Sequence, residues 1–254
     1  MKRAYLDNAA TTPVDPKVLE AMMPFFSENF GNASSIHDFG QQALKAVDQS
    51  RETVANFLGC EPKEIFFTSG ATEANNAILF SLLEKTRTRS LITTGVEHPS
   101  VYEPAKKLKQ MGVDVRTIQP DSNGFIDPVS IAESIDTHTG LISVIHVQNE
   151  IGTIQPIKII GKLIREKEKQ VGHRIHFHAD MVQALGKIKI DLKELDVDSA
   201  SFSGHKFCGP KGTGILFMRN PSPLLFRGGE QEFGVRTRTK NVPAINGISK
   251  VVEK

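Results

Sequence analysis

Lys206 is the residue of this sequence with the clearest potential for covalent chemistry. It lies in "SFSGHKFCGPKGTG" (201–214), directly after the alternating segment "VDSASFS" (197–203), and glycines and small residues follow it. A lysine amine attacks carbonyl groups only where desolvation or nearby positive charge keeps it partly deprotonated. A lysine among small residues at the end of a strand fits an aldehyde as its reaction partner; an ordinary surface lysine is the alternative.

The segment "SGATEANN" (69–76) has residue types that suit an anion site. Ser69, Gly70, Ala71 and Thr72 stand where a predicted strand becomes a predicted helix, and Glu73 falls in the first turn of that helix. Free N–H groups at the start of a helix bind phosphate well. The same residues are also compatible with a plain helix N-cap.

Four more polar residues follow predicted strands. Asp180 and Gln183 belong to "HADMVQ", His98 follows "TTGVE", and Asn149 lies in "QNEIG". An aspartate placed against a heteroaromatic ring nitrogen would keep that nitrogen protonated, so that the ring could accept electrons. An imidazole could stack on such a ring or move protons. The alternatives are an N-cap for Asp180, a loop histidine for His98 and a turn residue for Asn149.

A metal site is not expected. His173, His176 and His178 are close in sequence, but on a strand only His176 and His178 share a face, and no cysteine or carboxylate spacing completes a zinc site. The segment "GPKGTG" lacks the spacing of a P-loop.

The elements that must position these residues alternate between strands and helices. Nearly continuous apolar strands that alternate with helices are expected in a mostly parallel sheet covered on both faces, which binds ligands at the carboxyl ends of its strands. The pattern predicts strands at 64–68, 90–94, 113–119, 141–147, 174–177 and 197–203, and helices at 16–26, 41–59, 71–85, 100–111, 127–135, 157–170 and from about 242. We expect one α/β domain with an N-terminal arm over about 1–14.

Composition excludes several classes of function. The 254 residues carry 31 basic and 29 acidic side chains, a net charge of +2, so neither nucleic acid nor an anionic membrane is an expected partner. No apolar run is long enough to span a bilayer and no secretory signal is visible, which predicts a cytoplasmic protein. Cys60 and Cys208 cannot form a disulfide framework.

Several motifs, taken in order, resemble one known family over almost the whole chain. The sequence is similar to cysteine desulfurases of the NifS/IscS type, which are class V, fold-type I pyridoxal-phosphate enzymes with a seven-stranded, mostly parallel sheet. The resemblance rests on "LDNAATTPVD", "FTSGATEANN", "EHPSV", "QNEIGTIQP", "HADMVQALGK", "SFSGHKFCGPKGTG" and "RTRTKNVP".

The resemblance implies a role for each candidate residue toward pyridoxal 5′-phosphate. Lys206 would bind the cofactor covalently, Asp180 would pair with its pyridine nitrogen, and His98 would stack on its ring and assist proton transfer. The remaining contacts implied are Ala71, Thr72, Ser203 and His205 with the phosphate, Asn149 and Gln183 with the ring substituents, and Thr239 with the phosphate of the partner subunit in a homodimer.

The resemblance also implies a reaction and its partners. L-cysteine would be converted to L-alanine while its sulfur passes as a persulfide to an enzyme cysteine, and then to an iron–sulfur scaffold or another sulfur-acceptor protein. The family's sulfur-accepting cysteine and its substrate-binding arginine belong to later segments, in a small C-terminal domain that these 254 residues do not include, and neither Cys60 nor Cys208 matches that cysteine. We therefore expect a cofactor-binding large domain, with Lys254 not necessarily its natural end.

Some residues depart from the family pattern. Glu230 and Phe233 stand in "RGGEQEFG" where the family has a glycine and an arginine, the hairpin after Arg219 is short, and "RTRT" replaces R-S-G-T before Thr239. The alternatives to a desulfurase are a selenocysteine lyase or another class V lyase, and a non-catalytic scaffold that binds sulfur-transfer partners.

Overall fold

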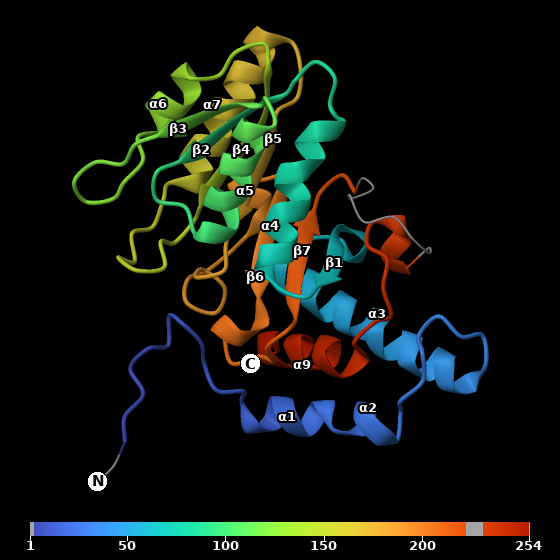
Figure 1. Cartoon of the computed structure of the whole chain (residues 1–254). Helices are drawn as coiled ribbons and strands as arrows, with labels where there is room; N and C mark the ends of the chain where they lie inside the picture. Colours follow the sequence, from blue (N-terminus) through green and yellow to red (C-terminus); the bar gives the residue numbers. More distant parts are fainter. Residues whose placement is uncertain (1–2, 222–230, 254) are drawn as a thin grey trace.

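Seven strands form one sheet in the part of the chain that the computed structural model describes, residues 3–221 and 231–253 (Figure 1). The strand order is β1-β7-β6-β5-β4-β2-β3, and β7 runs antiparallel to both of its neighbours while the other pairs are parallel. The strands are β1 (Ile65–Thr68), β2 (Ser90–Thr94), β3 (Asp114–Ile118), β4 (Thr139–Ile145), β5 (His176–Asp180), β6 (Ser199–Ser203) and β7 (Gly214–Met218). The predicted mostly parallel sheet is confirmed. Glu230 and the hairpin after Arg219 fall at least partly outside the described residues, as does the side chain of Phe233.

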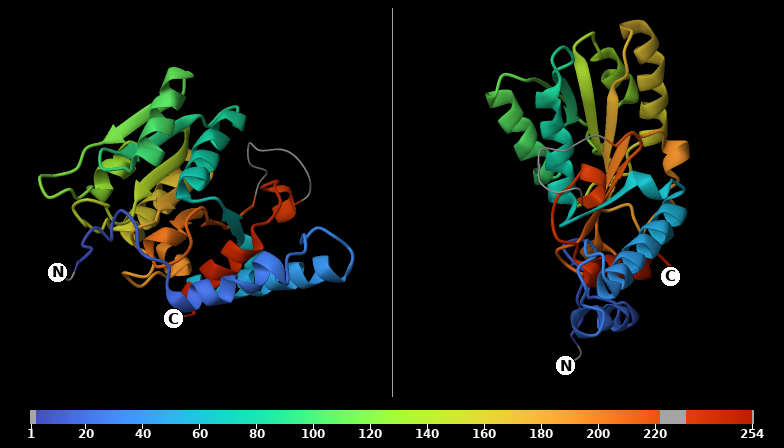
Figure 2. Two further views of the ribbon diagram at one scale, coloured as in Figure 1. Left: turned by 60° about the horizontal axis from the view of Figure 1, so that its bottom comes forward. Right: turned by 90° about the vertical axis from the view of Figure 1, so that its right-hand side faces the viewer.

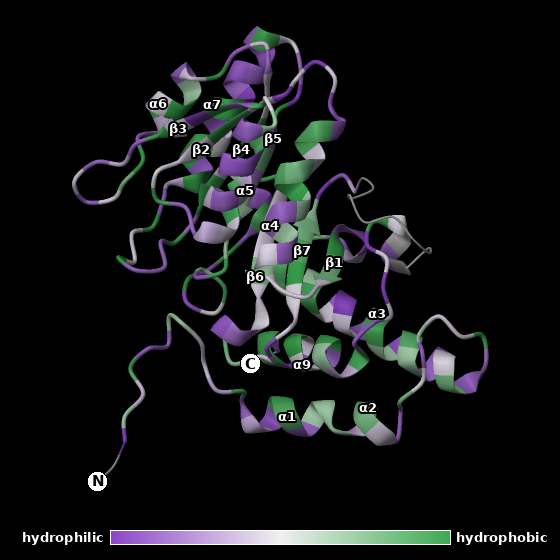
Figure 3. Cartoon of the chain, in the orientation of Figure 1, coloured by the Kyte–Doolittle hydropathy of each residue, from purple (hydrophilic) through white to green (hydrophobic). Residues whose placement is uncertain are grey.

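Helices cover both faces of the sheet (Figure 2, right). Neighbouring residues on a strand point to opposite faces, so Phe66 packs under the layer of α4 and α5, while Phe67 packs under the layer of α3, α6, α7 and α9. The main helices are α1 (Pro16–Met22), α2 (Pro24–Ser27), α3 (Asp38–Leu58), α4 (Ala71–Phe80), α5 (Pro99–Gln110), α6 (Pro128–Glu133), α7 (Ile157–Val171), α8 (Leu192–Leu195) and α9 (Val242–Val252). Figure 3 shows their mixed apolar and polar faces.

Local sequence signals explain where several elements begin and end. Gly59 closes α3 in the left-handed conformation (φ 71°), as expected for a helix C-cap, and the Asn241 side chain accepts a hydrogen bond from Ala244 N at the start of α9. The predicted helix 16–26 is wrong in one respect, because it divides at Met23, directly before Pro24. The predicted strand 174–177 was also misplaced, since β5 begins at His176 and continues to Asp180.

The N-terminal segment before α1 runs past the loop that carries Lys206 (Figure 1). Thr12 N donates to His205 O (2.9 Å), and Asp15 N donates to Cys208 O (3.0 Å). These bonds hold the segment against the end of β6, although it contains no helix or strand among its described residues. No helix in the described parts of the chain is both long and apolar enough to cross a membrane.

Candidate active site

A cavity of about 760 Å³ opens at the carboxyl ends of the parallel strands. Loops after β1, β2, β4, β5 and β6 contribute to its lining, together with the N-terminal segment. Nine of the ten predicted site residues line it: Ala71, Thr72, His98, Asn149, Asp180, Gln183, Ser203, His205 and Lys206. The fold thus brings together residues as far apart in sequence as Ala71 and Lys206.

The start of α4 forms one wall of the cavity. Gly70, its N-cap, has φ 150°, which side-chain-bearing residues rarely adopt, and a Cβ on neighbouring Gly214 would lie 2.7 Å from Gly70 Cα. The two glycines therefore let the strand-to-helix turn approach β7 closely. The first N–H groups of this ten-residue helix have no carbonyl partner within the helix, so the Ala71 and Thr72 amides can serve an anion in the cavity.

Lys206 lies in the short 3₁₀ helix η3 (Gly204–Lys206) that follows β6. Its Nζ donates to Ala9 O (2.6 Å) and Ala10 O (2.7 Å) of the N-terminal segment. Burial lowers the pKa of Lys206, while the negative charges of Asp7 and Asp180 oppose that change. The lowered pKa is what a lysine needs in order to react with a carbonyl group.

Asp180 is the last residue of β5 and is only 2% exposed. Its Oδ1 accepts from Val182 N (3.1 Å) and its Oδ2 from Asn75 Nδ2 (2.8 Å). Burial raises the pKa of Asp180, and these two donors with the charges of His98 and Lys206 offset part of that rise. These neutral donors reduce the cost of a negative charge on Asp180, and a cationic ligand group in the cavity would reduce it further.

His98 is the N-cap of α5, an arrangement that sequence reasoning missed. Its Nδ1 accepts from Ser100 N (3.1 Å) and lies 2.8 Å from Ser100 Oγ. The ring is therefore fixed by its own helix through Nδ1, and among the described residues Nε2 has no hydrogen-bond partner.

The other predicted residues differ in how firmly they are held. Gln183 Nε2 donates to Ala9 O (2.9 Å), and Gln183 Oε1 accepts from Lys187 Nζ. His205 Nδ1 lies 3.1 Å from Thr11 Oγ1, and burial, followed by the charges of Lys206 and Lys211, lowers its pKa. Asn149 lines the cavity from the loop after β4.

Thr239 is exposed in the segment before α9 and does not line the cavity. Its role toward a partner subunit stays a prediction. Neither cysteine lines the cavity either. Cys60 is half-buried after α3, and burial raises the pKa of its thiol to about 12, so it is not a ready thiolate. Cys208 has a left-handed backbone (φ 67°) and its N–H donates to Thr12 Oγ1 (2.7 Å).

Two of the three neighbouring histidines lie within β5 rather than at a metal site. His176 and His178 share the Ser199 hydroxyl, at 2.7 and 2.8 Å, while His173 Nε2 lies 2.9 Å from Thr139 O. Within residues 3–221 and 231–253, no three histidine, cysteine or acidic side chains are grouped so that they could hold a metal ion.

Sequence reasoning missed several residues that support the site. Asn75 was assigned only to a helix, although it bonds Asp180, and the carbonyls of Ala9 and Ala10 that receive Lys206 Nζ carry no side-chain signal. Arg236 pairs with Glu73 in the first turn of α4, and its NH2 lies 2.6 Å from Glu73 Oε2. A charged pair such as Glu73 and Arg236 cannot be recognised from sequence when its members are so far apart.

A buried carboxylate, a lysine of lowered pKa and an open helix start around one cavity, on a mostly parallel α/β sheet, define an enzyme site for an anionic, carbonyl-bearing cofactor. The chain belongs to the class-V aminotransferase family, whose model matches residues 4–251. Enzymes of this family use pyridoxal phosphate, and the three features fit its ring nitrogen, aldehyde and phosphate, respectively.

Comparison with individual proteins gives a finer relationship. The chain is 44% identical over 258 aligned positions to the protein named "Putative cysteine desulfurase IscS 1" of Bacillus subtilis (strain 168), covering 100% of this chain and 66% of that protein. A solved structure titled "NIFS-LIKE PROTEIN" matches with a TM-score of 0.95 and 43% identity, over 99% of this chain and 69% of the other. A structure titled "SspA in complex with cysteine" matches with a TM-score of 0.92 and 40% identity, over 99% and 72%.

The predicted resemblance to cysteine desulfurases of the NifS/IscS type is confirmed by these similarities. The chain spans 61 to 66% of the length of the curated cysteine desulfurases described by these comparisons.

Proposed function

We propose that these residues form the pyridoxal-phosphate-binding part of a cysteine desulfurase that acts on L-cysteine. The observation that carries the proposal is the meeting of Lys206 and Asp180 in one cavity beside the start of α4. The similarity to proteins named cysteine desulfurase and to an SspA structure with cysteine supports the choice of substrate. We treat residues 1–254 as one large domain with an N-terminal arm over about 1–14.

Each residue has a defined task in this proposal. The cofactor supplies an electron sink for the bond cleaved at the substrate carbon. Lys206 Nζ binds the cofactor aldehyde and then moves a proton at the substrate Cα, which its lowered pKa favours. Asp180 holds a proton on the ring nitrogen. His98 stacks on the ring and moves a proton at the substrate.

The remaining contacts orient the cofactor. The Ala71 and Thr72 amides, with Ser203 and His205, hold its phosphate at the start of α4. Asn149 and Gln183 bind the ring substituents, and Gln183 is already fixed by its bond to Ala9 O. Thr239 reaches the phosphate of a second copy in a homodimer.

The sulfur-transfer step needs a thiol that the cavity lining does not supply. Cys60 and Cys208 lie outside the lining of the cavity, and the pKa of Cys60 is raised to about 12. We therefore expect the 254 residues by themselves to bind the cofactor and to convert L-cysteine slowly. An iron–sulfur scaffold or another sulfur-acceptor protein is the partner that the proposed reaction requires, and a cytoplasmic location belongs to the same proposal.

The test is to incubate the purified chain with pyridoxal phosphate, reduce it with borohydride and map the labelled peptides by mass spectrometry. We expect one phosphopyridoxyl adduct, at Lys206, and none in Lys206→Ala. Lys211 also lines the cavity, so Lys211→Ala is the matched control and should keep the adduct at Lys206. Label spread over surface lysines would contradict the proposal.

Substrate choice is tested separately on the protein that carries a sulfur-accepting thiol. Relative rates on L-cysteine and L-selenocysteine distinguish a desulfurase from a selenocysteine lyase. Partner binding that survives Lys206→Ala, in a chain that never forms the adduct, would instead support a non-catalytic scaffold.

A further inference from the structure

Asn75 is fully buried in α4 and touches three polar side chains around the candidate site. Its Nδ2 donates to Asp180 Oδ2 (2.8 Å) and to Ser100 Oγ (2.9 Å), while its Oδ1 lies 3.0 Å from His178 Nε2. All of the hydrogen-bonding capacity of the NH2 group is therefore used at two points. One amide group connects Asp180 with the residue that holds His98.

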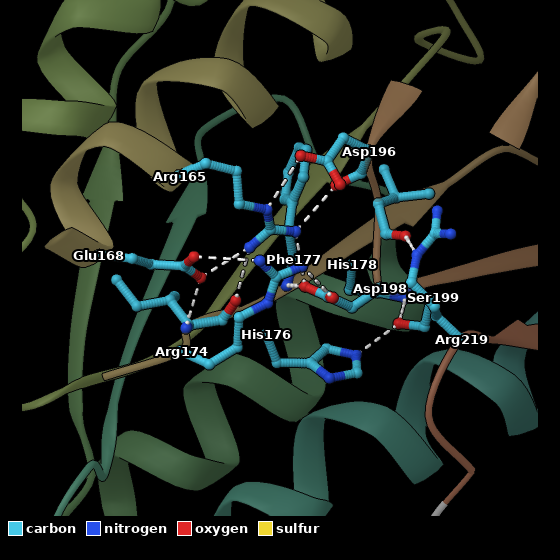
Figure 4. A network of polar contacts seen from close by, with 12 residues as sticks. Arg165, Glu168, Arg174, His176, Phe177, His178, Asp196, Asp198, Ser199 and Arg219 are labelled. Carbon is cyan, nitrogen blue, oxygen red and sulfur yellow. Dashed lines mark hydrogen bonds and ion pairs between the residues drawn. The ribbon is translucent and has the colours of Figure 1, made fainter. Parts of the chain in front are cut away.

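The chemistry of the partners fixes which way the Asn75 amide faces. An Asp180 carboxylate only accepts hydrogen bonds, so Asn75 must present its NH2 group to it, and its oxygen then faces His178. Burial lowers the pKa of His178 to about 3, so its ring is neutral and its single proton lies on Nε2. His178 Nδ1 then accepts from the Ser199 hydroxyl (2.8 Å), which in turn accepts from His176 Nε2 (Figure 4).

The same reasoning fixes the protonation of His98 on the other side. Because Ser100 Oγ accepts from Asn75, its own hydrogen is free to be donated to His98 Nδ1. Ser100 N points at the same ring nitrogen. With two donors at Nδ1, the proton of a neutral His98 lies on Nε2, the nitrogen left for the cavity.

We propose that Asn75 is a positioning residue that acts at two places, stabilising the Asp180 carboxylate directly and the Nε2–H form of His98 through Ser100. The inference uses the proposed function only for the tasks of Asp180 and His98. It adds that one buried side chain, Asn75, determines both the protonated nitrogen of His98 and the stability of the Asp180 carboxylate. The charged or titratable groups that act on Asp180 are His98 and Lys206 on the cationic side and Glu97 as a neighbouring carboxyl.

The test measures both ends of this arrangement by NMR on the unliganded chain, so neither cofactor binding nor turnover enters the result. We expect the ¹⁵N spectrum of the wild-type protein to show His98 protonated at Nε2. In Asn75→Ala, the ¹³C titration of the Asp180 carboxyl should move up by about 1 to 2 pH units, because one N–H donor to a charged group is lost. The Nδ1–H share of His98 should rise at the same time.

Three further variants separate positioning from a general loss of structure. Ser100→Ala should raise the Nδ1–H share of His98 and leave the Asp180 titration in place. Asn76→Ala is the control, because Asn76 is the next residue of α4 and its side chain bonds Thr72 O within the helix; it should change neither signal. If Asn75→Ala does not fold, Asn75→Ser serves for the Asp180 titration, since it also removes the amide donor.

An unchanged Asp180 titration in folded Asn75→Ala or Asn75→Ser would overturn the proposal. So would a wild-type His98 protonated at Nδ1.

Discussion

Two buried aspartates, Asp198 and Asp180, lie at opposite ends of adjacent strands, and their surroundings shift their pKa values in opposite directions. Asp198, just before β6, is 5% exposed and accepts from Arg165, Arg174 and Phe177 N, each at 2.8 Å (Figure 4). Burial alone would raise its pKa, but the arginines outweigh burial and lower it. Within the described parts of the chain, Asp180, at the end of β5, accepts hydrogen bonds only from neutral donors, and its pKa is raised.

The difference shows that the two ends of these strands have different roles: the end with Asp198 stabilises the fold, and the end with Asp180 forms the candidate active site. The charges around Asp198 are paired with one another, because Arg165 and Arg174 both contact Asp198 and both contact Glu168. At the cavity end, Asp180 and Lys206 each contact neutral groups, and Lys206 Nζ donates to two backbone carbonyls. A site in which opposite charges are held apart can take a ligand that brings its own complementary groups.

The strongest test of this contrast is Asp198→Ala. We expect the free energy of unfolding to fall by about 3–5 kcal/mol, because Arg165 and Arg174 would be left without the carboxylate between them. Urea denaturation measures the loss. The control is Glu194→Gln, which removes one partner of an exposed pair with Lys158 and should cost under about 1 kcal/mol. Equal losses in the two variants would contradict the assignment of Asp198 as a structural charge.

The pH dependence of the free energy of unfolding tests the state of His176 and His178, the buried histidines of β5. Burial lowers the pKa of His176 to about 4 and of His178 to about 3, from the usual 6.5. The unfolded chain therefore binds more protons than the folded chain below pH 6.5, so stability falls as the pH falls from 6.5 toward 4. The two histidines should together lower the stability by about 2–4 kcal/mol between pH 7 and pH 5, and the raised pKa of Glu97 offsets part of this loss.

The variant that checks this assignment is His176→Gln, which keeps an N–H donor for Ser199 but does not titrate. It should flatten the pH dependence, whereas the exposed His138→Gln should not change it. A His176→Gln variant whose stability changes between pH 7 and pH 5 by as much as that of the wild type would show that His176 is not held neutral.

Most strands and helices of the fold were predictable because nearby residues specify them, but β7 (Gly214–Met218) and the short α8 (Leu192–Leu195) were not predicted. Runs of apolar and β-branched residues such as 90–94 and capping residues such as Gly59 and Asn241 act within a few positions. The division of helix 16–26 at Pro24 was missed, although Pro24 itself was the signal. The end of β5 was missed because two of its last three residues, His178 and Asp180, are polar.

Much of the candidate site was predictable because its side chains follow strands whose carboxyl ends meet. The sequence does not show which polar residues are buried beside the predicted site residues. Asn75 and Asn76 are adjacent and identical in type, but one residue turns a helix by about 100°, so only Asn75 points to Asp180. The contact of Lys206 with Ala9 O joins backbone and side chain across 197 positions, where no local pattern exists.

Glu97 extends the contrast to a second carboxyl near the cavity. Its Oε1 accepts from Thr94 Oγ1 and Ile145 N, its Oε2 is buried without a partner in the described structure, and burial raises its pKa to about 8. A raised pKa means that stability is lost as the pH rises from about 4.5 through 8. Glu97→Gln should remove this loss and stabilise the protein at pH 8 by on the order of 2 kcal/mol.

Thermal or urea unfolding at pH 5 and pH 8 measures the effect of Glu97→Gln. The control is Glu103→Gln on the exposed face of α5, which should behave as wild type at both pH values. An equal effect of Glu97→Gln at pH 5 and pH 8 would mean that the carboxyl is not protonated in the folded chain.

The smallest expected effect separates the two arginines that hold Asp198. The Arg174 side chain is 52% exposed, whereas that of Arg165 is 14% exposed and also contacts Glu168 and Asp196. Solvent screens the Arg174 charge, so Arg174→Gln should lower the free energy of unfolding by only about 0.5–1 kcal/mol, while Arg165→Gln should cost several times more. Urea denaturation at low and high salt provides the measurement, and added salt should reduce the Arg174 effect more than the Arg165 effect. If Arg174→Gln lowered the free energy of unfolding more than Arg165→Gln, the exposed arginine would be the main partner of the Asp198 charge. The difference between Asp198 and Asp180 would then come from solvent exposure of the partner and not from a buried ion pair.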